Sequence, residues 1–394
     1  MSTAVGAAIA VSLLVAGPLP ALAGAPHHPV TSQQSPDKDA VSMAGQFSAT
    51  LTAQPRYRLG EPIALTFDLH NATGRDHSVL EWNTPLENPD QEVLDYLRVS
   101  RDGGELGYAG RVIKRGDPEP SDYRLIRAGE TLRSTIDVST SFEITEPGTY
   151  TATLDTHLRD VIDRSADAPA ARALGQFTRV DLGTASVTFE VVAGGTPRLP
   201  LSAALQPGDQ TADRPHLADS PKDPKFVGGT ASRREATEKA HKNAYKYADK
   251  SVGALPNPAP NPAPNRYITW FGKYQKDRYA LARSHFVKIR EHMEDTVITY
   301  DLEPAGCKSS VYAYVYPNQP TKIYLCGQFW KAPGTGTDSK AGTIVHEQSH
   351  FTVNGGTDDY KYGQDACKKL AKDDPDKAVM NADNHEYFAE SISI

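Results

Sequence analysis

The stretch Ala341-Gly-Thr-Ile-Val-His-Glu-Gln-Ser-His-Phe351 places two histidines, His346 and His350, four residues apart with Glu347 beside the first. On a helix, residues four apart lie on one face, so both imidazoles can reach a single metal ion. The glutamate can take a proton from a water on that metal. The segment therefore predicts a helix that carries a hydrolytic zinc centre.

The residues before this motif favour a buried helix. Ile344 and Val345 are apolar, and Thr337-Asp338-Ser339 offers side chains that can cap a helix N-terminus. The motif alone also fits an amphipathic core helix whose two histidines are hydrogen-bonded within the protein. The zinc interpretation therefore needs a third ligand.

The composition is that of a soluble globular protein long enough for two or three domains. The 394 residues are 23% charged and 39% hydrophobic, with a formal net charge of −7. Residues 230–394 carry 22 Lys+Arg and 20 Asp+Glu, a balance of +2, and the remainder carries 20 and 29, a balance of −9. With no basic run or basic, aromatic-rich stripe, we expect no nucleic-acid partner.

The first 23 residues resemble a secretory signal peptide. An apolar run from Ala4 to Val15 is followed by Gly17-Pro18 and by the small-x-small cleavage pattern Ala21-Leu22-Ala23. The run departs from the usual pattern because no Lys or Arg precedes it. No other segment approaches 18 apolar residues, so we expect no membrane span and a secreted, extracellular protein.

Three cysteines occur, all in the last quarter of the chain: Cys307, Cys326 and Cys367. Two of them should pair in an oxidising compartment. Cys307 and Cys326 bracket a predicted hairpin and are the better pair. Cys367 is then expected to be a small buried hydrophobe on a helix.

Residues 24–195 predict an antiparallel β-sandwich of roughly immunoglobulin type. Short runs rich in β-branched and aromatic residues alternate with turn residues, and no group of side chains there has catalytic spacing. The clearest strand candidates are residues 47–52, 63–68, 149–154 and 186–191.

Residues 196–229 are rich in Pro, Asp, Gly and Ser and predict a linker that contains the activation cleavage region. Helical character follows at once, with a capping box at Ser232–Glu235. The later elements are expected to be helices at 236–252 and 277–293, a hairpin of 311–316 and 322–326, the zinc helix and a last helical region. The fold class is therefore α+β, with a mainly helical zincin-type catalytic domain and a small sheet over residues 230–394.

Three options for the third zinc ligand follow His350. A third histidine at metzincin spacing is absent from Phe351–Gly356. Glu386, 36 residues past His350, would make a gluzincin site. A carboxylate just after the paired glycines 355 and 356 is the remaining option, with Asp358 and Asp359 as candidates.

Gly356-Thr357-x-Asp359-x-x-Tyr362-Gly363, following the histidine motif, resembles the signature of the aspzincin metalloproteases. Further similarity points to the peptidyl-Lys metalloendopeptidases within that family. It covers roughly residues 230–394 and leaves out the front half. The segments that carry it include Tyr267–Gly272, Ala313–Asn318, Phe329–Pro333 and Asp374–Phe388.

The resemblance implies His346, His350 and Asp359 as ligands of one zinc ion per catalytic domain. It implies Glu347 as the general base that activates the zinc-bound water, and Tyr362 as the donor to the developing oxyanion. Asp358, the rival carboxylate, falls on a free position of the signature.

The resemblance also implies that Asp383 and Glu386 bind a substrate lysine on the leaving-group side. The same stretch, Asp383-Asn-His-Glu386, is also compatible with a capping box for the last helix. His385 between them is expected at the surface or just outside the metal ligands.

We therefore expect a secreted zinc endopeptidase that cleaves on the amino side of lysine. It would be made as a precursor that is cut near Gly229-Thr230, with its own N-terminal domain as candidate intramolecular inhibitor. Since no cysteine precedes Cys307, that inhibition cannot use a thiolate on zinc. The alternatives are a deuterolysin-like aspzincin protease without lysine specificity, and a non-catalytic adhesive protein with a protease-like domain.

Overall fold

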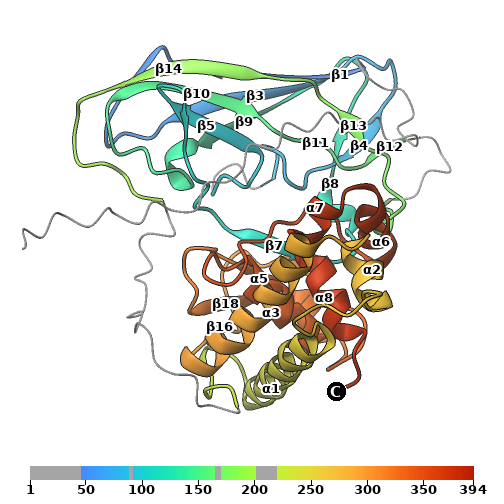
Figure 1. Ribbon diagram of the computed structural model, residues 1–394. Helices are drawn as coiled ribbons and strands as arrows, with labels where there is room; N and C mark the ends of the chain where they lie inside the picture. Colours follow the sequence, from blue (N-terminus) through green and yellow to red (C-terminus); the bar gives the residue numbers. More distant parts are fainter. Residues whose placement is uncertain (1–45, 88–91, 165–169, 201–219) are drawn as a thin grey trace, which may run out of the picture. The chain divides into compact units, whose positions relative to one another are not determined.

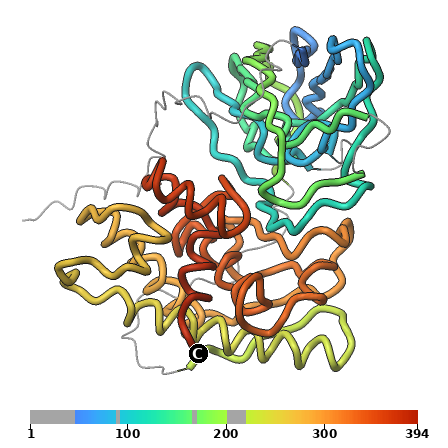
Figure 2. The backbone as a smooth tube through the Cα atoms, turned by 90° about the vertical axis from the view of Figure 1, so that its right-hand side faces the viewer, coloured from blue at the N-terminus to red at the C-terminus, as the bar shows by residue number. Residues whose placement is uncertain are grey.

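Strands dominate the chain before residue 200 and helices dominate it after residue 230 (Figures 1 and 2). The computed structural model describes residues 46–87, 92–164, 170–200 and 220–394. Contacts across these ranges join strands and helices into one compact unit. The expected signal peptide, residues 1–23, and most of the expected linker lie outside the described residues.

Two sheets of the strand-rich part enclose one hydrophobic core. Alternate residues of the central strand β3 are buried, as expected when one face of a strand is covered. The first sheet has the order β1 (Phe47–Ala53), β3 (Ala64–Asn71), β9 (Thr131–Asp137). The second has the order β2 (Arg56–Arg58), β14 (Ser186–Val192), β10 (Gly148–Leu154), β5 (Leu97–Arg101), β6 (Gly104–Glu105).

One strand pair of the second sheet differs from the antiparallel prediction. β14 pairs in parallel with β2, with Glu190 opposite Arg56, whereas its other neighbour β10 is antiparallel. The prediction of a wholly antiparallel front half is therefore wrong at this edge. Smaller strand groups complete this part: β12 (Val161–Asp163), β4 (His77–Leu80) and β8 (Tyr123–Ile126), and the pair β11 (His157–Leu158) and β13 (Val180–Asp181).

The helical part contains a five-stranded sheet with contributions from three regions of the chain. Its order is β15 (Lys225–Val227), β16 (Thr299–Asp301), β18 (Lys322–Leu325), β17 (Val311–Val315), β7 (Val112–Arg115). The predicted hairpin is confirmed as the antiparallel pair β17 and β18. β15 corrects the linker prediction, since residues 225–227 pair in parallel with β16. β7 comes from the strand-rich half.

The helices α1, α3, α5 and α8 pack against one another around a second hydrophobic core. The predicted capping box of α1 is wrong, because Thr230 caps the helix and its side chain accepts from the Arg233 amide. None of the described helices combines the length and apolar character needed to cross a bilayer. Their bounds are α1 Ala231–Ala254, α2 Asn265–Phe271, α3 Lys276–Asp295, α4 Gly327–Lys331, α5 Lys340–His350, α6 Gln364–Asp373, α7 Pro375–Val379 and α8 Ala382–Glu390.

Candidate active site

The helix α5 carries the histidine pair and is buried along its whole length from Ala341. Ser339 caps it, with its side chain accepting from the Gly342 amide at 2.9 Å. A Cβ added at Gly342 would lie 2.0 Å from a carboxylate oxygen of Glu390 on α8. Glycine at this position therefore leaves room on α5 for the Glu390 carboxylate of α8, the helix that also carries Asp383 and Glu386.

A bend after α5 brings the chain back to the histidines. Gly356 has φ +58°, a left-handed conformation that glycine adopts without strain, and its amide bonds to the Phe351 carbonyl at 3.1 Å. Three residues later, the Asp359 Oδ1 atom lies 3.2 Å from Nε2 of His346 and 3.6 Å from Nε2 of His350. The bend therefore gathers two imidazole nitrogens and one carboxylate, all buried.

The spacing of these three groups fits zinc. Ligand atoms about 2.0–2.1 Å from a shared tetrahedral ion lie roughly 3.3 Å from one another, close to both measured separations. Among the described residues, neither histidine Nε2 nor either Asp359 oxygen has a hydrogen bond of acceptable geometry. Buried polar atoms left without partners are costly unless a bound group satisfies them. The donor set of two nitrogens and one oxygen is one that zinc accepts.

The other ring nitrogen of each histidine faces an oxygen atom on the side away from Asp359. His350 Nδ1 donates to the Thr357 carbonyl at 2.6 Å, which leaves its Nε2 as an acceptor facing Asp359. His346 Nδ1 lies 2.9 Å from Asp383 Oδ1. Both rings therefore turn Nε2 toward the Asp359 carboxylate.

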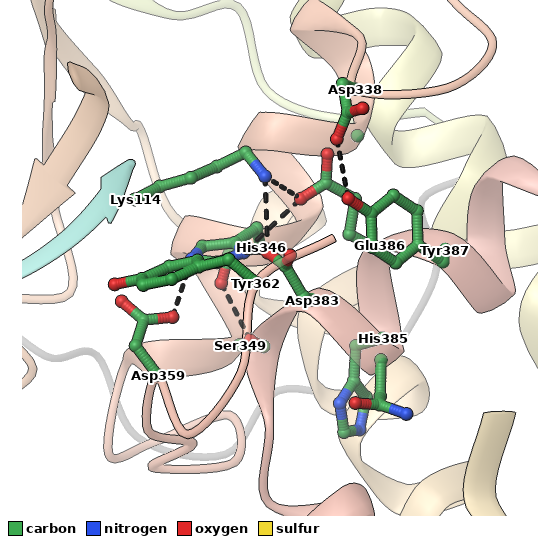
Figure 3. A network of polar contacts seen from close by, with 12 residues as sticks. Lys114, Asp338, His346, Ser349, Asp359, Tyr362, Asp383, His385, Glu386 and Tyr387 are labelled. Atoms are coloured by element: carbon green, nitrogen blue, oxygen red, sulfur yellow. Dashed lines mark hydrogen bonds and ion pairs between the residues drawn. The ribbon is translucent and has the colours of Figure 1, made fainter. Parts of the chain in front are cut away.

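Asp383 and Glu386, both on α8, hold a lysine from the other half of the chain (Figure 3). The Lys114 ammonium lies 2.5 Å from Glu386 Oε2 and 3.3 Å from Asp383 Oδ1. Burial would lower the pKa of Lys114, but the two carboxylates outweigh it and hold that pKa well above its usual value. The pocket therefore binds a charged ammonium group.

Glu347 and Tyr362 lie at the same site with reactive groups turned inward. Glu347 is fully buried, and neither of its carboxylate oxygens has a hydrogen-bond partner among the described residues. Burial raises the pKa of Glu347 to about 8. The Tyr362 hydroxyl donates to the Ile113 carbonyl at 2.7 Å.

The rival residues lie elsewhere. Asp358 forms a backbone bridge with Asn381, and its side chain accepts from the Tyr360 hydroxyl at 2.8 Å. Glu386 lies 3.3 Å from Nδ1 of His346, on the opposite side of the ring from the Nε2 that faces Asp359. The geometry thus supports Asp359 as third ligand over both Asp358 and Glu386.

The structure excludes the capping box predicted at the start of α8 and a surface position for His385. Asn381 is the N-cap residue, and its side chain donates to Asn384 Oδ1 at 2.7 Å but caps no backbone amide of the helix, so Asp383-Asn-His-Glu386 does not form a capping box. His385 is fully buried and lies 3.0 Å from His285 Nδ1 through its Nε2 atom, so it is not a surface residue. It belongs to the packing between α8 and α3.

The cysteines lie outside the metal centre. A disulfide joins Cys307 and Cys326, with Cα atoms 5.2 Å apart, and ties the loop before β17 to the end of β18. Cys367 is free and buried on α6.

Lys114 is a residue of the candidate site that no sequence pattern revealed. It lies 269 and 272 residues before its two partners, within an ordinary Val-Ile-Lys-Arg tract. The only local signal was that this tract is β-prone and ends in two basic residues.

Two histidines one helical turn apart, a returning carboxylate and a buried glutamate define the class as a zinc-type metallopeptidase. Comparison with known proteins gives the family. A family model described as lysine-specific metallo-endopeptidase, of the aspzincins, matches residues 258–390. An extracellular protease of Aeromonas hydrophila is 36% identical over 333 residues, which cover 84% of this chain and 88% of that protein. The chain belongs to the aspzincin family of zinc metalloendopeptidases.

Fungal relatives match a smaller region. A peptidyl-Lys metalloendopeptidase of Grifola frondosa is 55% identical over 126 residues, or 32% of this chain and 35% of that protein. A solved zinc peptidase from Grifola frondosa is 47% identical and covers 41% of this chain and 97% of that one, with a TM-score of 0.39. The Aeromonas match is longer than the 165 residues from 230 to 394, so it extends into the strand-rich half.

Proposed function

We propose that this metalloendopeptidase cleaves peptide bonds on the amino side of lysine, with one zinc ion held by His346, His350 and Asp359. The single observation that supports the lysine preference best is the Lys114 ammonium between Asp383 and Glu386, beside the candidate ligand His346. The fungal relatives named peptidyl-Lys metalloendopeptidases add to this support.

Zinc at this site would polarise the scissile carbonyl and make a water more acidic. Glu347 takes the proton of the attacking water and passes it to the leaving amine. Tyr362 donates its hydroxyl hydrogen to the carbonyl oxygen as negative charge develops there. Asp383 and Glu386 bind the ammonium of the lysine that follows the cut bond, and Asp383 also orients His346.

We propose further that the chain is exported through a signal peptide at residues 1–23 and matures by a cut within residues 196–229. The name of the Aeromonas relative, an extracellular protease, supports export. Lys222 bonds to the end of α3 through its amide and the Met293 carbonyl, at 2.9 Å, just before β15. A cut upstream of Lys222 would therefore leave β15 with the enzyme, whereas a cut at Gly229-Thr230 would remove an edge strand.

Mass spectrometry of the peptides from one denatured protein, digested with and without a chelator, tests the proposal. We expect new N-termini to begin with lysine and to vanish when zinc is removed. Cuts without preference for lysine would favour a deuterolysin-like activity instead. A folded, zinc-loaded and processed protein that makes no cuts would favour the adhesive alternative.

A further inference from the structure

The edge strand β7 belongs in sequence to the strand-rich half but in hydrogen bonding to the catalytic sheet. It pairs antiparallel with β17, with Ile113 opposite Tyr314 and Lys114 opposite Ala313. Gly116, the residue after β7, continues the contact: its amide donates to the Ser310 carbonyl at 2.8 Å. An extended segment added to a sheet edge is a common way for a protein to bind a peptide.

The side chain of Lys114 is enclosed by the catalytic half. Its side chain is only 2% exposed, and its ammonium contacts Asp383 and Glu386. The same ammonium lies 5.0 Å from the centre of the Tyr312 ring on β17. A buried lysine is stable only when its charge is paired, and here both of its carboxylate partners belong to the proposed lysine pocket.

The residue before Lys114 presents its backbone carbonyl to the catalytic tyrosine. The Tyr362 hydroxyl donates to the Ile113 oxygen at 2.7 Å. In the proposed reaction, this hydroxyl donates a hydrogen bond to the carbonyl oxygen of the bond to be cut, and the lysine that follows that bond binds between Asp383 and Glu386. The Ile113–Lys114 peptide bond has both features.

Contacts on either side hold the segment in this register. The Arg111 amide, just before the segment, donates to Glu92 at 3.1 Å, and the guanidinium of Arg115, the last residue of the segment, lies 2.9 Å from a Glu87 oxygen. Both pairs are buried and lie within the strand-rich half. The segment is therefore presented as a rigid, preorganised strand, which reduces the entropy lost on binding.

We propose that residues Val112–Arg115 are an internal substrate analogue that keeps the precursor latent, with Lys114 in the lysine pocket and the Ile113 carbonyl in place of the scissile carbonyl. This rests on the proposed lysine specificity. A segment tethered in the same chain acts at an effective concentration of about a millimolar or more, so it outcompetes ordinary substrates.

A binding experiment on the zinc-loaded full chain tests this inference without catalysis. All proteins carry Glu347→Gln, and the probes are a fluorescent peptide with a central lysine and the same peptide with norleucine there. Lys114→Ala should bind the lysine peptide on the order of a hundredfold more tightly than the parent. The matched control is Lys308→Ala, which removes a lysine of the catalytic half that lies 3.3 Å from Asp122 of the strand-rich half, away from the pocket. It should bind as weakly as the parent.

Lys114→Met keeps the aliphatic stem and guards against a folding defect, which circular dichroism and thermal melting would reveal. The inference is overturned if the parent binds the lysine peptide as tightly as folded Lys114→Ala and Lys114→Met do. It is also overturned if Lys308→Ala increases the affinity for that peptide as much as Lys114→Ala does. If the Lys114 variants gain binding to the lysine and norleucine peptides alike, the latency mechanism holds and the proposed lysine preference fails.

Discussion

At the scale of single residues, the proposed role of Glu347 differs from that of the three proposed zinc ligands. Its oxygens lack partners among the described residues, while His346 and His350 point their Nε2 atoms at Asp359. We expect Glu347→Gln in the processed enzyme to lower kcat by about 10²–10⁴-fold, because it removes the proton acceptor. Zinc content, measured by atomic absorption, should stay at the wild-type level.

Asp359→Ala is the matched variant, and it should lose zinc together with activity. Retention of full zinc by this variant would contradict the assignment of the third ligand. So would a Glu347→Gln enzyme that cleaves at the wild-type rate, since the proposed general base would then be dispensable.

Substitutions of Asp383 and Glu386, the acidic residues of the proposed lysine pocket, should have different effects on zinc affinity. Asp383 Oδ1 lies 2.9 Å from Nδ1 of His346, and its Oδ2 accepts from the Gly363 amide at 2.8 Å. Because it orients a ligand, Asp383→Asn should weaken zinc affinity by about 10–100-fold as well as impair lysine binding.

Glu386 is closer to the ammonium than to the histidine, at 2.5 Å against 3.3 Å. Glu386→Gln should therefore keep zinc and lose most of the preference for lysine over norleucine, measured as a ratio of kcat/KM values. Loss of zinc by Glu386→Gln, with Asp359→Ala retaining it, would revive the glutamate-ligand alternative.

At the scale of elements, the long helix α1 is joined to the catalytic sheet through a neutral histidine. His241 Nε2 donates to the Lys222 carbonyl at 3.0 Å, so its Nδ1, 2.8 Å from the Tyr300 hydroxyl on β16, accepts from that hydroxyl. Burial lowers the pKa of His241 to about 4 from the ordinary 6.5. Between about pH 6.5 and pH 4, His241 therefore binds a proton in the unfolded chain but stays neutral in the folded protein.

This difference fixes the sign of a pH effect. The stabilisation from His241 is fully present above pH 6.5 and is lost as pH falls toward 4, by about 3 kcal/mol in total. Thermal melting from pH 7 to pH 4 should show a shallower decline for His241→Gln than for the wild type. Since other buried histidines also take up protons in this range, the prediction concerns the difference between the melting temperatures of the two proteins at each pH. Parallel curves would contradict it.

The sequence predicts local elements well and long-range pairings poorly. Two β-prone runs around a turn located the hairpin β17–β18, and the histidine motif with its N-cap candidates located the helix α5, because both signals come from neighbours in the chain. The linker residues 225–227 carried no strand signal of their own. They form β15 because the edge of β16 offers unpaired backbone groups.

The same reasoning explains which parts of the site were found. His346, Glu347 and His350 lie within five residues, so spacing alone groups them, whereas Asp359 was preferred to Asp358 and Glu386 only through the resemblance to the aspzincin signature. Lys114 reaches that group only through the pairing of β7 with β17, which no short-range pattern encodes.

At the scale of the whole molecule, we expect a cut in the proposed linker and release of the catalytic half to be separate events. The strand-rich half stays attached through β7, through the Ser309 hydroxyl that donates to Glu119, and through a hydrophobic core that includes Tyr314 and Tyr316 of the catalytic half. A cut between residues 200 and 220 breaks none of these contacts.

We therefore expect the two fragments to co-elute in size-exclusion chromatography after such a cut, with little activity on a lysine peptide. Activity should appear when the N-terminal fragment is displaced or degraded. Full activity while the fragments still co-elute would show that the strand-rich half does not block the site.

The lysine between Asp383 and Glu386 also bears on how the catalytic half assembles. The strand-rich half leaves the ribosome first, so the Lys114 ammonium is already present when α5 and α8 pack together. A chain made without that half must bury Asp383 and Glu386 side by side without the Lys114 ammonium to offset their repulsion. The N-terminal half would then act as an intramolecular chaperone, and the mature enzyme, once stripped of it, would refold poorly from denaturant.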